Sequence, residues 1–294
     1  MDPEKCTFGG YVEFMSENQF GKLSRLLIRA AEKEGKTVPE DVYFTAPFKL
    51  MRPFPLENGG LRYMQMAASA GIMEGDRQQM EFEVKKGAFL EFISQAYEKI
   101  HEMKSGCAGR QTKVTVHSGG SFYFHPQPTI PFKDSAFENH MEIYLENDSA
   151  QFRMSEILSC GRYARGERFA YRSYLNLVEI YRGGKMIYRD NTRYDPALFN
   201  MEGIGMYESY THLSNIFISR PADPENFKEK IKDILEKALD PAYGGKITEH
   251  PFEGGVTLLP GKDLAVRILG RRAQDLEMLN EKIMALPDTI RKDV

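Results

Sequence analysis

Short runs of apolar or alternating residues, separated by turn residues, recur through most of the chain. Because successive side chains of a strand point to opposite faces, such alternation predicts half-buried β-strands. The runs are Gly87 to Ile93, Lys113 to His117, Ser121 to His125, Met141 to Glu146 and Gln151 to Leu158. With 15 Tyr, 19 Phe and no Trp, the aromatic content favours the same class. The sequence therefore predicts a mainly β, layered or sandwich-like scaffold.

A glycine pair marks the clearest turn. Gly183-Gly184 separates the run Arg168 to Tyr181 from Lys185 to Tyr188, and it predicts a hairpin because glycine takes positive φ at both turn positions without strain. Asp190-Asn191 and Asp195-Pro196 are predicted to close this segment.

The end of the chain predicts two α-helices. The first follows Asp223 as N-cap, has Pro224 at its first position and presents one apolar face as far as Leu239. The second runs from Ala273 to Leu286 and stops at a proline. Strands are predicted at His212 to Ile218, Val256 to Leu259 and Leu264 to Leu269. The tail is therefore expected to run strand, helix, strand, strand, helix.

We expect one domain over residues 1–294, with an extension at 1–20, a β-rich body at 21–221 and a C-terminal part at 222–294 that holds both helices. Within the body, Leu23 to Ala30 matches both a helical stripe and strand alternation, so the residues alone leave its conformation open.

Charge and cysteine content restrict the partners and the compartment. The 39 basic and 42 acidic residues are interspersed and give a net charge of −3, which argues against nucleic-acid and membrane binding. Cys6, Cys107 and Cys160 have no paired spacing, so a disulfide framework or thiolate zinc site is not expected. The first residues lack a secretory signal pattern. Together these features predict a cytoplasmic protein.

Two acidic residues are predicted on inward faces. In a strand from Gln151 to Leu158, Glu156 lies on the same face as Phe152 and Met154. Beyond a turn at Gly161, Glu167 shares a face with the apolar residues of the next run. Since an unpaired buried carboxylate costs several kcal/mol, each acid must pair with a cation, become protonated or line a wet cavity.

Two interpretations of these acids stay open. In the first, nearby arginines neutralise them in a structural network, the arginines being Arg162, Arg165 and Arg168. In the second, the acids line an internal polar passage, where oxygen ligands and water hold a divalent metal ion loosely.

Other polar residues give weaker indications. Asp76 lies in a glycine-bounded turn, where capping of backbone amides is the default role and metal binding the alternative. Glu98 and His101 would share a face of a helix but lie on opposite sides of a strand. The segment His140 to Glu146 has the alternation of a strand with one solvated face, and Cys160 is expected to be a buried, inert thiol.

Enzyme signatures are mostly missing. The chain has no Walker A loop, no GxGxxG, no HExxH and no GxSxG, and its histidines form no catalytic set by spacing. A hydrolase that uses Asp76 or Cys160 is the one enzyme alternative.

Several motifs resemble those of one family. Phe132 to Phe137 follows the proline-rich Pro126 to Pro131, and EILSCGRYARGERF at Glu156 to Phe169 contains the specific Gly-Arg-x-Ala-Arg-Gly-Glu core. Together they resemble the urease accessory protein UreD family, called UreH in some organisms. Ser69 to Asp76 is similar to its glycine-rich GD segment, although Glu74-Gly75 replaces two glycines. The ordered match runs from residue 35 to 196, with a compatible stretch at 256–267 and a UreH-like stretch at 95–103.

The resemblance implies a mostly β scaffold with two helices, in which Leu23 to Ala30 becomes a strand. It also implies a non-enzymatic scaffold that assembles with UreF and, through UreF, with the GTPase UreG. This assembly, expected to be dimeric, would dock on apo-urease and deliver nickel. Nickel(II) would be bound only transiently, with no tightly bound cofactor.

Releasable nickel suits scattered carboxylates and water better than a closed His/Cys cage, since nickel binds nitrogen and oxygen ligands more tightly than magnesium or iron(II) does. The predicted passage residues are Asp76, Glu156, Glu167, Glu98 and His101. The alternative is a purely structural adaptor that bridges UreF and urease without metal contact.

Overall fold

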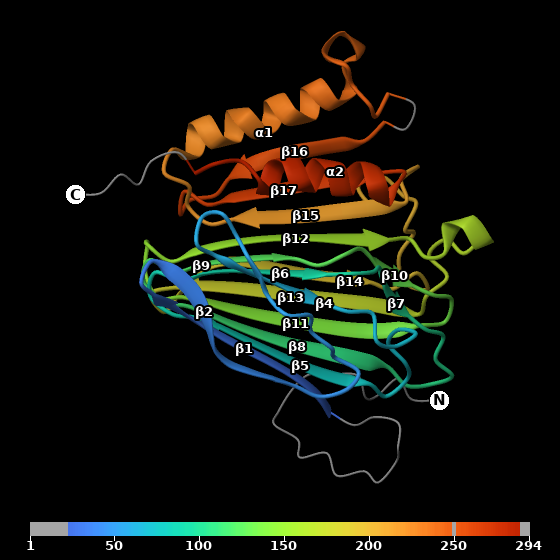
Figure 1. Cartoon of the computed structure of the whole chain (residues 1–294). Helices are drawn as coiled ribbons and strands as arrows, with labels where there is room; N and C mark the ends of the chain where they lie inside the picture. Colours follow the sequence, from blue (N-terminus) through green and yellow to red (C-terminus); the bar gives the residue numbers. More distant parts are fainter. Residues whose placement is uncertain (1–22, 249–250, 289–294) are drawn as a thin grey trace.

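The computed structural model describes residues 23–248 and 251–288, so the predicted extension at 1–20 and Cys6 lie outside the described residues. Two β-sheets face each other, and two α-helices form a third layer against the outer face of one sheet (Figure 1). The mainly β, layered fold class is therefore confirmed. Neither helix of the described part has the length and apolar content needed to cross a bilayer.

The first sheet has seven strands in the order β14-β13-β11-β8-β5-β1-β2. Their bounds are β1 (Leu23–Lys33), β2 (Lys36–Phe44), β5 (Arg77–Val84), β8 (Ala108–Val116), β11 (Ala136–Leu145), β13 (Ser173–Arg182) and β14 (Lys185–Tyr194). The strands from β1 to β13 pair in parallel, and the edge strands β2 and β14 are antiparallel to their neighbours.

The second sheet follows the order β16-β17-β15-β12-β9-β6-β4-β3, with β10 and β7 attached beside β12. Its bounds are β3 (Phe54–Pro55), β4 (Leu61–Gln65), β6 (Phe89–Ser94), β7 (Glu98–Ile100), β9 (Ser121–His125), β10 (Thr129–Pro131), β12 (Gln151–Ser159), β15 (His212–Ile218), β16 (Glu253–Leu258) and β17 (Leu264–Gly270). Strands β4, β6, β9 and β12 are parallel, whereas β12, β15, β17 and β16 are antiparallel.

Through its middle, the chain alternates between the sheets, from β5 to β6, β8 to β9, β11 to β12 and then to β13. Each passage adds one strand to each sheet, so parallel neighbours stack as they do in a β-helix. The inward residues meet in an apolar core that includes Phe82, Phe92, Phe122 and Phe152. The Phe82 ring lies 4.9 Å from the centroids of both Phe92 and Phe122.

The helices α1 (Pro224–Leu239) and α2 (Ala273–Met284) cover the outer face of β12, β15 and β17. Asp223 caps α1 as predicted, since its carboxylate accepts a hydrogen bond from the Asn226 backbone N–H at 3.1 Å. The predicted tail order is confirmed, although α2 ends at Met284 rather than Leu286. Two short 3₁₀ helices, η1 (Tyr163–Arg165) and η2 (Pro241–Tyr243), lie in connecting segments.

Most predicted strands are confirmed, and Leu23 to Ala30 forms part of β1. The hairpin is confirmed too, with φ of +55° and +77° at Gly183 and Gly184. Two boundaries are wrong. Residues 168–172 belong to a connecting segment before β13, and β14 continues past Asp190-Asn191 because it stays paired with β13 until Tyr194 lies opposite Tyr174.

Candidate functional site

A polar row crosses the inner face of the first sheet. The row takes one residue from each of five neighbouring strands, held at matching register positions: Gln78 on β5, Arg110 on β8, Asn139 on β11, Asn176 on β13 and Thr192 on β14. The inward row two residues further along is apolar for most of its length, with Met80, Met141 and Val178 among its members. On the inner face of the first sheet, this row is therefore more polar than the row next to it, which includes Thr112 and Asp190 beside its apolar members.

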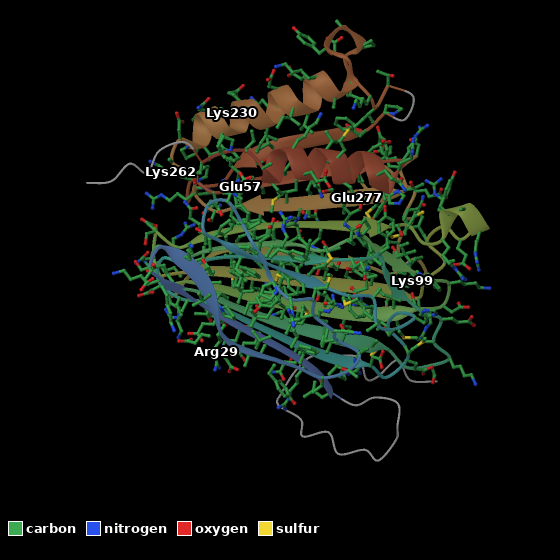
Figure 2. The ribbon with its side chains drawn as sticks, in the orientation of Figure 1. Arg29, Glu57, Lys99, Lys230, Lys262 and Glu277 are labelled. Carbon is green, nitrogen blue, oxygen red and sulfur yellow. The ribbon has the colours of Figure 1, made fainter. Side chains whose placement is uncertain are left out.

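A second polar row faces it from the other sheet. Glu156 on β12 lies opposite Asn215 on β15, and Asn215 lies opposite Arg267 on β17. The rows are in contact, since the Asn176 side-chain amide donates to Glu156 Oε2 at 3.2 Å. A polar layer therefore runs through the sandwich. Surface charges such as Arg29 on β1 and Lys230 on α1 instead project from the outside of the molecule (Figure 2).

Glu156 lies where its strand alternation predicted. It shares the inner face of β12 with Phe152, Met154 and Leu158, all of which are buried. Burial raises the pKa of Glu156 to about 7, and the nearby negative charge of Asp190 adds to the rise, while the Asn176 hydrogen bond opposes it. A carboxyl group with this pKa changes between its protonated and ionised forms near neutral pH.

Glu156 lines a cavity of about 40 Å³. Two buried side-chain oxygens of this lining, Oδ1 of Asn139 and Oδ1 of Asn215, have no hydrogen-bond partner. Buried acceptors without a donor are costly, and the volume is sufficient for a few water molecules or a partly hydrated ion. The residues that line this cavity therefore include one carboxyl group and two amides whose oxygens are buried without a donor, a chemistry that suits a cation or water.

A second cavity, of about 100 Å³, adjoins the first. Both linings include Glu98, Arg110, Phe124 and Pro126, so these residues form the junction between the cavities. The second cavity is also lined by residues 67–70, which are exposed. The second cavity therefore lies between the shared residues at Glu98 and Arg110 and the surface at segment 67–70.

The junction is held by an ion pair. Arg110 Nη1 donates to Glu98 Oε2 at 2.9 Å, and its Nη2 donates to Glu98 Oε1. Both side chains are largely buried, 12% exposed for Arg110 and 20% for Glu98. Arg110 also donates to Gln78 Oε1, from Nε at 2.9 Å and from Nη2 at 2.6 Å. The guanidinium is therefore shared between a carboxylate of β7 and an amide of β5.

A second acid–arginine pair, Asp190 with Arg267, lies near Glu156. Arg267 Nη2 contacts Asp190 Oδ2 at 2.5 Å, and the Thr192 hydroxyl donates to Asp190 Oδ1 at 3.0 Å. Asp190 is buried, whereas the Arg267 side chain is 59% exposed. Sequence reasoning missed Asp190 because Asp-Asn was interpreted as a turn. It also missed Arg110, whose inward alternation on its strand was the available signal.

Glu167 does not lie where the sequence predicted. It belongs to the segment between β12 and β13, and it lines neither cavity. Arg162 Nε donates to Glu167 Oε2 at 2.7 Å, and the Lys133 backbone N–H donates to the same oxygen at 3.1 Å. The hydrogen bond from Arg162 lowers the pKa of Glu167. The prediction that Glu167 shares a strand face with apolar residues was wrong, because no strand forms at this position.

Of the three predicted arginine partners, Arg162 alone forms an ion pair with Glu167 within the described part of the chain. Arg168 pairs with Glu202 at 2.9 Å and also donates to backbone carbonyls of the following loop. Arg165 is exposed. None of the three neutralises Glu156.

Asp76 caps its turn, as the default interpretation predicted, because its Oδ2 accepts from the Met73 backbone N–H at 2.8 Å. Glu98 begins the short strand β7, and His101 follows the end of that strand with Nε2 at 2.9 Å from the Ala70 carbonyl oxygen. Asp76 and His101 line neither cavity, so the structure brings together only Glu98 and Glu156 among the predicted passage residues.

Another acidic group lies on the outer face of the first sheet. His140, Glu142 and Glu179 place ligand atoms within 4.8 Å of one another. The same Glu179 carboxylate pairs with Arg189 at 3.2 Å. The half-buried alternation predicted for this segment is confirmed, and the group is separate from the polar layer.

Cys160 is buried, and burial raises the pKa of its thiol to about 11, which matches the prediction of an inert thiol.

Taken together, the two sheets define a β scaffold whose interior carries a polar layer that includes the carboxyl groups of Glu98, Glu156 and Asp190.

Comparison with known proteins identifies the family. The family model described as "UreD urease accessory protein" matches residues 23–293. "Urease accessory protein UreD" of Acetivibrio thermocellus is 40% identical over 265 residues, covering 90% of this chain and 96% of that protein. "Urease accessory protein UreH" of Helicobacter acinonychis is 33% identical, covering 88% and 93%, and that of Helicobacter pylori strain J99 is 31% identical, covering 92% and 96%. The chain belongs to the UreD family of urease accessory proteins.

Proposed function

We propose that this protein is a non-enzymatic scaffold and nickel chaperone, which acts with UreF and the GTPase UreG to deliver nickel to apo-urease. The observation that carries the proposal is the polar layer around Glu156, with its adjoining cavities and two unpartnered amide oxygens. Relatives named as urease accessory proteins support the same role.

The chemistry of the layer suits transient binding. The Glu156 carboxylate and the amide oxygens of Asn139 and Asn215 are oxygen ligands, and the cavity leaves room for water. Such ligands would hold Ni²⁺ less tightly than imidazole and thiolate ligands do, so the ion can be released. Because binding requires ionised Glu156, and its pKa is about 7, uptake of the ion displaces a proton from part of the population.

The proposed passage runs from the exposed segment 67–70 to the junction at Glu98, and then to Glu156. Asp76, His101 and Glu167 are not assigned to it, because they line neither cavity.

The alternative is an adaptor that bridges UreF and urease without contact with metal. The buried acid–arginine pairs favour it, since Arg110 and Arg267 neutralise Glu98 and Asp190 without a metal ion.

The two functions are separated by Glu156→Gln, with Glu81→Gln on the outer face of β5 as a matched control. Each variant is co-expressed with UreF, UreG and apo-urease, and both UreF capture and the nickel content of urease are measured. The chaperone proposal expects Glu156→Gln to keep UreF capture but to reduce nickel content severalfold. Unchanged nickel content in a variant that still captures UreF would reject the passage. Loss of UreF capture, with Glu81→Gln unaffected, would favour the adaptor.

A further inference from the structure

The linings of the two cavities share four residues, and the Glu98–Arg110 ion pair is formed by two of them. Glu98 comes from β7, beside the second sheet, and Arg110 comes from β8 in the first sheet. The pair therefore spans the gap between the sheets at the point where the cavities meet. An ion that moved between the two cavities through the residues they share would pass next to this guanidinium.

We propose that Arg110 is an internal gate, a built-in cation that holds Glu98 until an entering divalent cation takes its place. This inference rests on the proposed nickel function. A guanidinium repels a divalent cation, and the repulsion is strong where little water screens it. The same guanidinium neutralises Glu98, so the carboxylate is unavailable as a ligand while the pair is closed.

The surroundings of Arg110 allow the pair to open. Its Nε and Nη2 both donate to Gln78 Oε1, and its guanidinium carbon lies 5.8 Å from the Phe137 ring centroid. When Glu98 turns to a divalent cation, Arg110 therefore keeps a hydrogen-bond acceptor and an aromatic face. Gln78 and Arg110 lie at matched register positions on adjacent strands, so this second anchor belongs to the sheet framework.

The two arginines of the polar layer differ in a way that singles out Arg110. The Arg267 side chain is 59% exposed and lines neither cavity, so it can leave Asp190 for solvent. The Arg110 side chain is only 12% exposed. It cannot withdraw into solvent, so it must exchange partners within the interior.

The test is a titration of the full-length purified protein with NiCl₂ by calorimetry. Stopped-flow transfer from a chromogenic chelator reports the rate of uptake. Arg110→Gln frees Glu98 while leaving an amide that can still reach Gln78. If the pair is closed in most molecules, we expect apparent Ni²⁺ affinity to rise about fivefold or more and uptake to become faster. Unchanged or weaker binding by the folded variant would overturn the gate.

A second comparison remains decisive if Arg110→Gln does not fold. Glu98→Gln leaves the guanidinium at the junction without a counter-charge, so we expect the weakest Ni²⁺ binding of the set. Adding Arg110→Gln to Glu98→Gln removes the repulsion, and Ni²⁺ binding should recover about fivefold. Equal affinity in this single and double variant would refute the repulsion.

Glu156→Gln distinguishes failure of the gate from failure of the proposed function. If Glu156→Gln does not change Ni²⁺ binding, the passage itself is wrong. If it weakens binding while removal of Arg110 has no effect, the passage stands and the gate is rejected. Arg267→Met serves as the matched arginine control, and we expect its effect on Ni²⁺ uptake to be smaller than that of Arg110→Gln.

Discussion

Replacing Glu156 with glutamine should make the protein more stable at alkaline pH. The pKa of Glu156 is raised to about 7, chiefly by burial, against an ordinary value of 4.5 for a glutamate in water. The folded state therefore binds this proton more tightly than the unfolded state does. The stabilisation that proton binding by Glu156 gives to the fold is fully present below pH 4.5 and is lost as the pH rises through 7. Above pH 7 the wild-type fold contains an ionised carboxylate in its interior, whereas the Glu156→Gln variant has an uncharged amide there.

The magnitude follows from the difference between the two pKa values. A difference of about 2.5 pKa units corresponds to about 3 kcal/mol between the protonated and ionised forms. Most of this, roughly 2 to 3 kcal/mol, is lost between pH 5 and pH 8. Glutamine keeps the acceptor for the Asn176 amide, which lies 3.2 Å from Glu156 Oε2. We therefore expect Glu156→Gln to exceed wild type by about 3 kcal/mol at pH 8, with little advantage at pH 5.

Urea denaturation at pH 5, 6, 7 and 8 measures this difference, and thermal melts should show a shift of roughly 5 °C at pH 8. Other titrating groups are common to both proteins, so their contributions largely cancel in the difference. Glu81→Gln, on the outer face of β5, is the control and should follow wild type. Parallel pH profiles for wild type and Glu156→Gln would refute the reasoning.

Four further outcomes are expected. Asp263→Asn should destabilise the fold by about 3 kcal/mol in urea, because it leaves the buried Arg182 guanidinium without its main partner; a loss below about 1 kcal/mol would contradict this. Gly161→Ala should lower the melting temperature, since φ is +128° and a Cβ would lie 2.9 Å from the Glu167 carbonyl oxygen; an unchanged melt would contradict it. Glu167→Gln should leave Ni²⁺ affinity close to wild type by calorimetry, and a severalfold loss would return this acid to the passage. Ni²⁺ affinity of wild type should rise with pH up to about 7 and then level off, with a flatter profile in Glu156→Gln.

Local patterns predicted the features that depend on neighbouring residues. Alternation placed Glu156 on the inner face of its strand, and the cap at Asp223 with Pro224 set the start of α1. The glycine pair at 183–184 set the hairpin, because its positive φ values are a backbone requirement. These predictions hold because strand alternation, capping and turn geometry act over a few residues.

The same logic failed where long-range pairing decided the outcome. Alternation predicts a strand at Glu167, but the strand begins only at Ser173, where β13 pairs with β11. The Asp-Asn pair at 190–191 predicts a turn, but β14 continues there because it stays paired with β13 as far as Tyr194, opposite Tyr174.

The sequence by itself determined the mainly β class, the order of elements in the tail and the inward direction of Glu156. Only the tertiary structure decided that Glu98, 58 residues before Glu156 in the numbering, lines the same cavity, and that Arg110 lies between two cavities. The reason is physical. Alternation along a strand fixes the face on which each side chain lies. The pairing of parallel strands fixes which inward polar groups meet. This pairing joins segments far apart in the chain, so local sequence patterns do not determine it.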